Sequence, residues 1–177
     1  MPKDSEEVRK LLKELLKSQK ETDRMMKETD KRMKEITDGQ ARFIEGLASP
    51  SAERIFEEMG YQVMDILHRR KIKRNGKIVA EIDTMMELQK DGRKILGVGE
   101  ASSHMTADKV LDFIECIKNL RNYLTLYRNY TIIGFVAGSD YDKGVDKFAI
   151  RNGLYVLKPS GEQMVLDVPR GFKPKIW

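Results

Sequence analysis

Acidic side chains stand in two short segments that otherwise read as buried strands. The first segment, 79–86, contains Glu81 and Asp83, and the second, 95–102, contains Glu100. A carboxylate inside a buried strand costs on the order of several kcal/mol unless a cation or strong hydrogen-bond donors hold it. This pattern favours a site that binds a positive ion.

The turn at 89–93 is expected to fold these two segments into a hairpin, which would bring Asp83 and Glu100 together. Because side chains of a strand alternate between its faces, Glu100 points to the same face as Ser102. Magnesium takes oxygen ligands, typically one or two carboxylates with a carbonyl and waters. We therefore predict a Mg²⁺ or Mn²⁺ site formed by Asp83, Glu100 and the carbonyl of Ala101.

These residues resemble the motif of the PD-(D/E)XK nuclease superfamily, the restriction-endonuclease-like enzymes. The resemblance rests on Asp83 in the second core strand and on the triplet Glu100-Ala101-Ser102 in the third. It implies a mixed sheet flanked by helices and a metal-dependent hydrolysis of phosphodiester bonds. The family has a lysine where this chain has Ser102, and that lysine positions or activates the attacking water. The catalytic assignment to Asp83, Glu100 and Ser102 follows from the resemblance.

Two further residues near the triplet could serve the site. Lys109, early in the helix that follows the third strand, would supply an ammonium group from another backbone position. His104 would supply a proton or a hydrogen bond to phosphate, although a histidine in a loop is more often simply exposed. The sequence leaves both alternatives open.

A helix before the strands provides another acidic candidate. Ser49-Pro50 predicts the start of a helix, because serine is a good N-cap and proline suits the first helical position, and Gly60 predicts its end. Within it, Ser51 to Arg54 resembles the first-helix motif of the same superfamily, which makes Glu53 an additional catalytic residue. Glu57, one turn later, is the competing candidate.

The resemblance extends along essentially the whole chain. A prokaryotic family places a coiled coil before this nuclease-like core and ends in Phe-x-Pro-Lys-x-Trp, and this chain ends in that pattern at 172–177. The segments 134–138 and 152–157 follow in the expected order. The resemblance therefore also implies an amino-terminal coiled coil.

Residues 8–47 show that periodicity directly, because two sets of positions alternate in steps of four and three, as the seam of a left-handed coiled coil requires. We predict a long coiled-coil helix through which the chain forms a homo-oligomer. Gly39 is expected to bend or end it, and the alternative is a helix that folds back on its own core. The seam positions are Val8, Leu12, Leu15, Gln19, Thr22, Met26, Thr29, Met33, Ile36, Gln40, Phe43 and Leu47.

The rest of the chain alternates strand and helix patterns, which predicts an α/β fold with a mixed sheet flanked by helices. We place a coiled-coil domain at 1–47 and the nuclease-like domain at 48–177. Expected strands are 61–74, 77–88, 94–102, 130–137 and 154–157, and expected helices are 106–127 and 140–151.

Positive charge is concentrated on the first predicted hairpin. The net charge is +5, and a cluster formed by Arg69, Arg70, Lys71 and Lys73 precedes the acidic strand. We predict that this cluster binds nucleic acid, with DNA as the expected partner. The alternative is a solvated strand pair whose charges discourage aggregation.

The expected location is cytoplasmic, with no membrane partner. Cys116 is the single cysteine, no apolar run reaches the roughly 20 residues that a membrane span needs, and the first residues lack a secretion signal.

The sequence leaves three functions open. The first is a metal-dependent nuclease multimerised by its coiled coil. The second is a catalytically inactive module of the same fold that binds nucleic acid or protein. In the third, the helix recruits a partner helix and the globular part is a scaffold.

Overall fold

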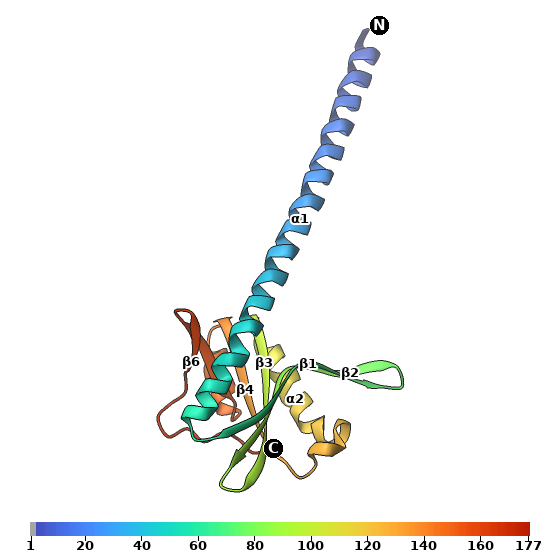
Figure 1. The fold of residues 1–177 in the computed structure, drawn as a ribbon. Coiled ribbons are helices and arrows are strands. Elements are labelled where there is room, and N and C mark those ends of the chain that lie inside the picture. Colours follow the sequence, from blue (N-terminus) through green and yellow to red (C-terminus); the bar gives the residue numbers. More distant parts are fainter. Residues whose placement is uncertain (1–2) are drawn as a thin grey trace. The chain divides into compact units, whose positions relative to one another are not determined.

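The computed structural model describes residues 3–177, with side chains from Glu6 onward. It divides into two compact units, one that ends at Gln40 and one that covers Ala41–Trp177. Helix α1, Lys3–Glu58, forms the first unit and contributes its last part to the second (Figure 1). The predicted domain boundary between residues 47 and 48 lies inside the second unit, within α1.

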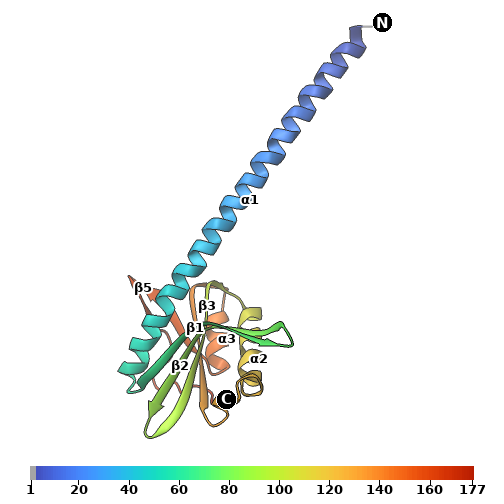
Figure 2. The same cartoon turned by 45° about the vertical axis from the view of Figure 1, so that its right-hand side comes forward.

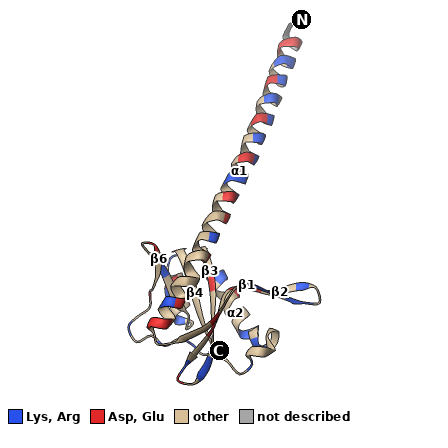
Figure 3. Ribbon diagram, in the orientation of Figure 1, with Lys and Arg blue, Asp and Glu red and all other residues tan. Residues whose placement is uncertain are grey.

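In the first unit, α1 carries a stripe of exposed apolar side chains that polar residues interrupt. Charged residues of both signs recur along this helix (Figure 3). Each large apolar residue of the stripe is more than half exposed; they are Val8, Leu11, Leu12, Leu15, Leu16, Met25, Met26, Met33 and Ile36. A long helix with one apolar face is what the heptad pattern predicts, and its pairing with another chain remains a prediction.

Helix α1 continues without a break through Gly39 and Pro50 to Glu58. A helix end at Gly39 and the predicted helix start at Ser49-Pro50 are therefore wrong. Proline inside a helix lacks the N–H that would bond four residues back, at a cost of about 3 kcal/mol. The apolar face of the helix on both sides of Pro50 offsets this cost by packing on the sheet; its buried members are Ile44, Ala48, Ala52, Ile55 and Phe56.

The end of α1 falls where the sequence predicts it. Gly60 adopts a left-handed φ of 82°, a conformation that glycine takes without strain. Its N–H donates to the carbonyl of Glu57, and the N–H of Tyr61 donates to the carbonyl of Phe56. This pair of bonds is the Schellman motif that closes many helices.

The second unit is built on a six-stranded mixed sheet with strands in the order β1-β2-β3-β4-β5-β6. β1–β2, β2–β3 and β5–β6 pair antiparallel, whereas β3–β4 and β4–β5 pair parallel. The predicted α/β class is confirmed, and only β6 was not foreseen. The strands are β1 (Gln62–Arg74), β2 (Lys77–Lys90), β3 (Arg93–Met105), β4 (Thr131–Tyr141), β5 (Tyr155–Ser160) and β6 (Gln163–Leu166).

Helices cover both faces of this sheet and create two apolar cores. On one face lie α2 (Ala107–Tyr123) and α3 (Val145–Arg151), with a short 3₁₀ helix, η1 (Thr125–Tyr127), after α2. The last part of α1 covers the other face (Figure 2). Parallel strands covered on both sides read as nearly continuous apolar runs, and β4 is buried from Ile132 to Gly138 as its sequence predicts.

In both strands of the β1–β2 hairpin, the regular alternation of side chains between the two faces is interrupted at the same position along the hairpin. Leu67 and Ile72 pack against the same core although they are an odd number of residues apart, and so do Ile82 and Met85. Regular strands place only every second residue on one face, so each strand contains an irregularity between these residues. Beyond this position the hairpin projects from the rest of the sheet (Figure 1).

Arg69 and Asp83 lie at this irregular position. The pairs His68–Thr84 and Arg70–Ile82 flank it, which places Arg69 opposite Asp83. Arg69 has a φ of +47°, a left-handed conformation that costs an L-residue roughly 1–2 kcal/mol. The backbone is therefore distorted at Arg69, opposite the residue that sequence analysis identifies as a metal ligand.

No helix in the described part of the chain, residues 3–177, is both long and apolar enough to cross a membrane.

Candidate active site

The sheet register brings Asp83 and Glu100 together. The β2–β3 ladder ends at the pair Thr84–Gly99, and continuing it by one step places Asp83 opposite Glu100. The N–H of Ala101 then donates to the Asp83 carboxylate over 2.8 Å. The two predicted ligands are thus neighbours across a strand pair that opens at this point.

Asp83 lines a hollow of about 490 Å³ beside the last part of α1, together with Arg42, Glu45, Ser49 and Arg69. Burial raises the pKa of the Asp83 carboxyl, while the hydrogen bond from Ala101 lowers it and the nearby charge of Glu45 raises it again. Glu45 itself is ion-paired with Arg69. Among the described residues, no ion pair to the Asp83 carboxyl group is formed.

Glu100 lines a second hollow, of about 400 Å³, between the distal hairpin and α2. Burial and the neighbouring charge of Asp83 raise the pKa of Glu100 to about 8, against the opposing effect of Lys109. Two partly buried carboxylates repel each other, and a cation bound between them would offset this repulsion. No ion pair to Glu100 is formed within the described part of the chain.

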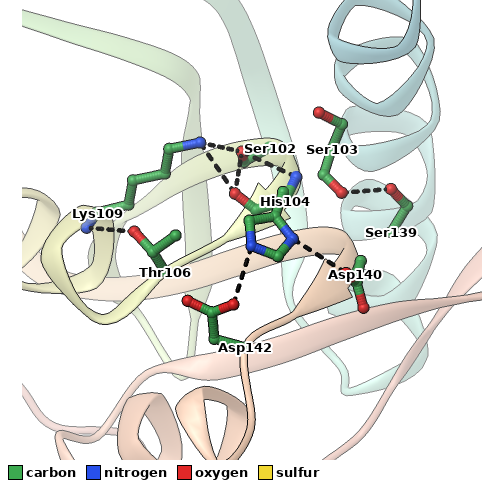
Figure 4. A network of polar contacts seen from close by, with 8 residues as sticks. All are labelled: Ser102, Ser103, His104, Thr106, Lys109, Ser139, Asp140 and Asp142. Carbon is green, nitrogen blue, oxygen red and sulfur yellow. Dashed lines mark hydrogen bonds and ion pairs between the residues drawn. The ribbon is translucent and has the colours of Figure 1, made fainter. Parts of the chain in front are cut away.

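Lys109 places an ammonium group next to the position of the missing lysine. Its Nζ donates to Ser102 Oγ over 2.7 Å and to the carbonyl of His104 over 2.9 Å (Figure 4). Ser102 is buried, at 7% exposed, and its hydroxyl donates to the same His104 carbonyl over 2.8 Å. The first turn of α2, capped by Thr106, thus places an ammonium group beside Ser102.

The ring of His104 pairs with acids other than Asp83 and Glu100. Its ring nitrogens lie 3.0 Å from Asp140 Oδ2 and 2.9 Å from Asp142 Oδ1 (Figure 4). These acids lie at and just beyond the end of β4. The His104 ring therefore links the end of β3 to the end of β4. Only the backbone carbonyl of His104 accepts a hydrogen bond from Lys109.

The acid that α1 brings to the site is Glu45 rather than Glu53 or Glu57. The charge of Glu45 raises the pKa of both Asp83 and Glu100, whereas that of Glu53 perturbs neither. Glu53 lies two helical turns further along α1 and is half-buried. Sequence analysis missed Glu45 because it fell within the segment assigned to the coiled coil.

The donor set at this point fits a hard divalent cation with few protein ligands. In residues 3–177, no three Asp, Glu, His or Cys side chains are grouped closely enough to hold a metal. The candidates are therefore Asp83, Glu100 and the Ala101 carbonyl. A strand residue directs its N–H and C=O toward the same neighbour, so this carbonyl faces the Asp83 side. Magnesium characteristically binds one or two carboxylates and keeps several waters.

The basic cluster on the hairpin is only partly free. Arg69 pairs with Glu45, and Lys71 Nζ lies 3.3 Å from Glu81 Oε1. Arg70 stacks over the ring of Tyr127 at 5.9 Å, while Lys73 is exposed near the hairpin tip, where positive charge gathers (Figure 3). The four residues predicted to contact nucleic acid thus differ in how much of their positive charge is already neutralised by neighbouring acids.

The chain matches no model of a known protein family, and it shows no significant similarity to a curated protein or to a solved structure. The resemblance to the nuclease superfamily therefore rests on the sequence motifs alone.

Proposed function

We propose that the second unit is a metal-dependent nuclease whose motif lysine has been replaced by Lys109. The observation that carries this proposal is the pair of hydrogen bonds from Lys109 Nζ to Ser102 Oγ and to the His104 carbonyl, 2.7 and 2.9 Å long. They hold an ammonium group beside Glu100. A serine alone in the triplet would argue for an inactive site, whereas a serine that positions a lysine argues for a working one.

Each residue then has a role in hydrolysis, in which a water oxygen bonds to phosphorus, one phosphorus–oxygen ester bond breaks, the water gives up a proton and the leaving oxygen gains one. Asp83, Glu100 and the Ala101 carbonyl would hold Mg²⁺ or Mn²⁺, which supplies a Lewis acid for the phosphodiester. Lys109 stabilises negative charge that develops on the phosphate oxygens, as preorganised cations do in phosphoryl chemistry. Ser102 keeps Lys109 in place.

The order of elements supports a restriction-endonuclease-like architecture. The chain runs through α1, β1–β3, α2, β4, α3 and β5, which is the order that the resemblance implies. The basic hairpin supplies a surface for nucleic acid, and the apolar stripe of α1 supplies one for self-association through residues 8–47. A homo-oligomer would present several basic hairpins to one nucleic acid and so strengthen weak binding.

The second candidate is a catalytically inactive nucleic-acid-binding module of the same architecture. It is favoured by one observation, namely that the described side chains form no group of three metal ligands. In the enzymatic candidate, Mg²⁺ bound by one or two carboxylates would complete its coordination with waters and substrate phosphate oxygens.

The experiment that separates the two is a cleavage assay on plasmid DNA and on structured RNA with Mg²⁺, Mn²⁺ or EDTA. We expect metal-dependent cutting by the wild type that is lost in Asp83→Asn and kept in Asp91→Asn. Asp91 is a matched control because it is an exposed turn residue with a φ of +50°, a conformation that asparagine tolerates well.

Binding without cutting under every condition, equal in the wild type and Asp83→Asn, would establish the inactive module instead. Neither binding nor cutting would contradict both candidates.

A further inference from the structure

The exposed stripe of the first unit is not uniformly apolar. Within Val8–Gln40 the seam has ten layers, of which six are apolar and four are polar. The apolar seam residues are each more than half exposed. Polar residues at seam positions lower the stability of a coiled coil and specify its register and orientation. The polar layers are Gln19, Thr22, Thr29 and Gln40.

We propose that this stripe docks a second copy of the chain in a parallel, in-register arrangement. Only that alignment sets every polar layer against an identical layer, so that Gln19 meets Gln19 and Thr22 meets Thr22 of the second copy. Side-chain amides and hydroxyls are both donors and acceptors, so identical polar layers satisfy each other and leave the apolar layers to pack among themselves. The inference rests on the self-association included in the proposed function.

The antiparallel alternative fits the same residues worse. The alignment that overlaps Val8–Gln40 fully sets Thr22 against Met26 and Val8 against Gln40. A buried polar group without a partner destabilises the pair. Each helix would have two such mismatches.

The residues that flank the seam include two contacts that favour the parallel arrangement. In the antiparallel alignment Asp23 lies next to Asp23 of the second copy, and like charges at such positions repel. In the parallel alignment the flanking positions bring Leu11 of one chain next to Leu16 of the other. Both leucines are more than half exposed in the first unit, so their contact would bury apolar surface.

Disulfide trapping of the full-length chain tests this arrangement. Cys116 is the only cysteine, so Cys116→Ser provides the background for three single variants. Leu15→Cys and Met33→Cys lie in the seam, where the antiparallel alignment pairs these two positions with each other. Lys17→Cys lies on the outer face, two residues from Leu15, and is the matched control. Light scattering gives the mass of each variant before oxidation.

We expect oxidised L15C alone to form linked chains at least about tenfold faster than K17C, because thiols held at one layer have a high effective concentration. M33C alone should behave like L15C. Rapid linking only in a mixture of L15C with M33C would overturn the parallel arrangement while leaving self-association intact. A monomeric mass for every variant would overturn self-association itself, and neither result bears on cleavage.

Discussion

Asp83 and Glu100 are neighbours across one strand pair, yet they occupy different settings. Asp83 accepts a hydrogen bond from the Ala101 N–H and opens toward α1, where Glu45 and Arg69 already neutralise each other. Glu100 opens toward α2, where Lys109 is the nearest cation and where burial raises its pKa to about 8. One carboxylate is stabilised by the backbone, and the other is not.

The difference indicates a division of labour. In active sites, two similar titratable groups take separate roles when their environments differ. The Asp83 side has a fixed hydrogen-bond geometry suited to holding a ligand. The Glu100 side, with its ammonium group and its proton-sensitive carboxyl, is suited to responding to charge. The predictions below test this division, beginning with the largest expected effect.

Lys109→Ala should lower the rate of metal-dependent cleavage by about 10²–10³-fold, the usual effect of removing one group that stabilises the transition state. The reason is that no other described ammonium group hydrogen-bonds to Ser102. Lys118→Ala on the same helix is the matched control, because that lysine is exposed and pairs only with Glu115. Initial rates on a labelled duplex measure the effect, and equal rates for the two variants would remove Lys109 from the mechanism.

Glu100→Gln should raise the free energy of unfolding at about pH 9 and leave it nearly unchanged at about pH 5. In metal-free buffer the pKa of Glu100 is raised from 4.5 to about 8 by burial and by Asp83. A carboxyl with a higher pKa in the folded than in the unfolded chain lowers stability as pH rises between those values. We expect a gain on the order of 2 kcal/mol in urea denaturation at the higher pH.

Glu115→Gln is a control for that measurement, because it should change the free energy of unfolding at high pH in the opposite direction. Hydrogen bonds from Lys118 and Asn119 lower the pKa of this exposed carboxyl. A lowered pKa contributes stability above the unfolded value, so this variant should lose stability at high pH rather than gain it. A similar gain in both variants would mean that the effect comes from net charge and not from the site.

Glu45→Gln should increase the metal concentration that gives half-maximal cleavage by roughly 3–10-fold, whereas Glu53→Gln should not. Glu45 lines the hollow of Asp83 and acts electrostatically on both candidate ligands. Removing one negative charge a short distance from a cation weakens its binding by about 1 kcal/mol in a well-screened setting. If only Glu53→Gln changed the metal dependence, the first-helix motif predicted from the sequence would be the relevant one.

The sequence predicts the strands well because their ends carry explicit signals. Asn75-Gly76 predicts the hairpin turn, and both residues have positive φ values, 50° and 75°, as a tight two-residue turn requires. β6 was missed because it has only four residues, Gln163–Leu166, of which Met164 alone is buried. A strand that short gives too little alternation to recognise.

The errors along α1 have a different cause, since there tertiary packing outweighs local preference. Gly39 and Ser49-Pro50 are reasonable stop and start signals, but packing of Phe56 and its apolar neighbours on the sheet keeps the helix continuous. Because the continuous helix was not expected, Glu45 was not recognised as part of the site. Lys109 was foreseen as an alternative, whereas its hydrogen bond to Ser102 depends on how α2 packs on β3 and cannot be read from spacing.

Lys73→Ala should reduce the salt dependence of DNA binding by about 0.9 in the slope of log K against log salt, the loss of one phosphate contact. Lys71→Ala should reduce it less, because Glu81 lies 3.3 Å from that ammonium group and already neutralises part of its charge. Glu81→Gln frees Lys71 and should therefore steepen the slope. Fluorescence anisotropy across a salt series measures all three. Equal slopes for the wild type and Lys73→Ala would mean that the hairpin charges do not contact DNA, and would leave nucleic-acid contact to the surface around the paired acids.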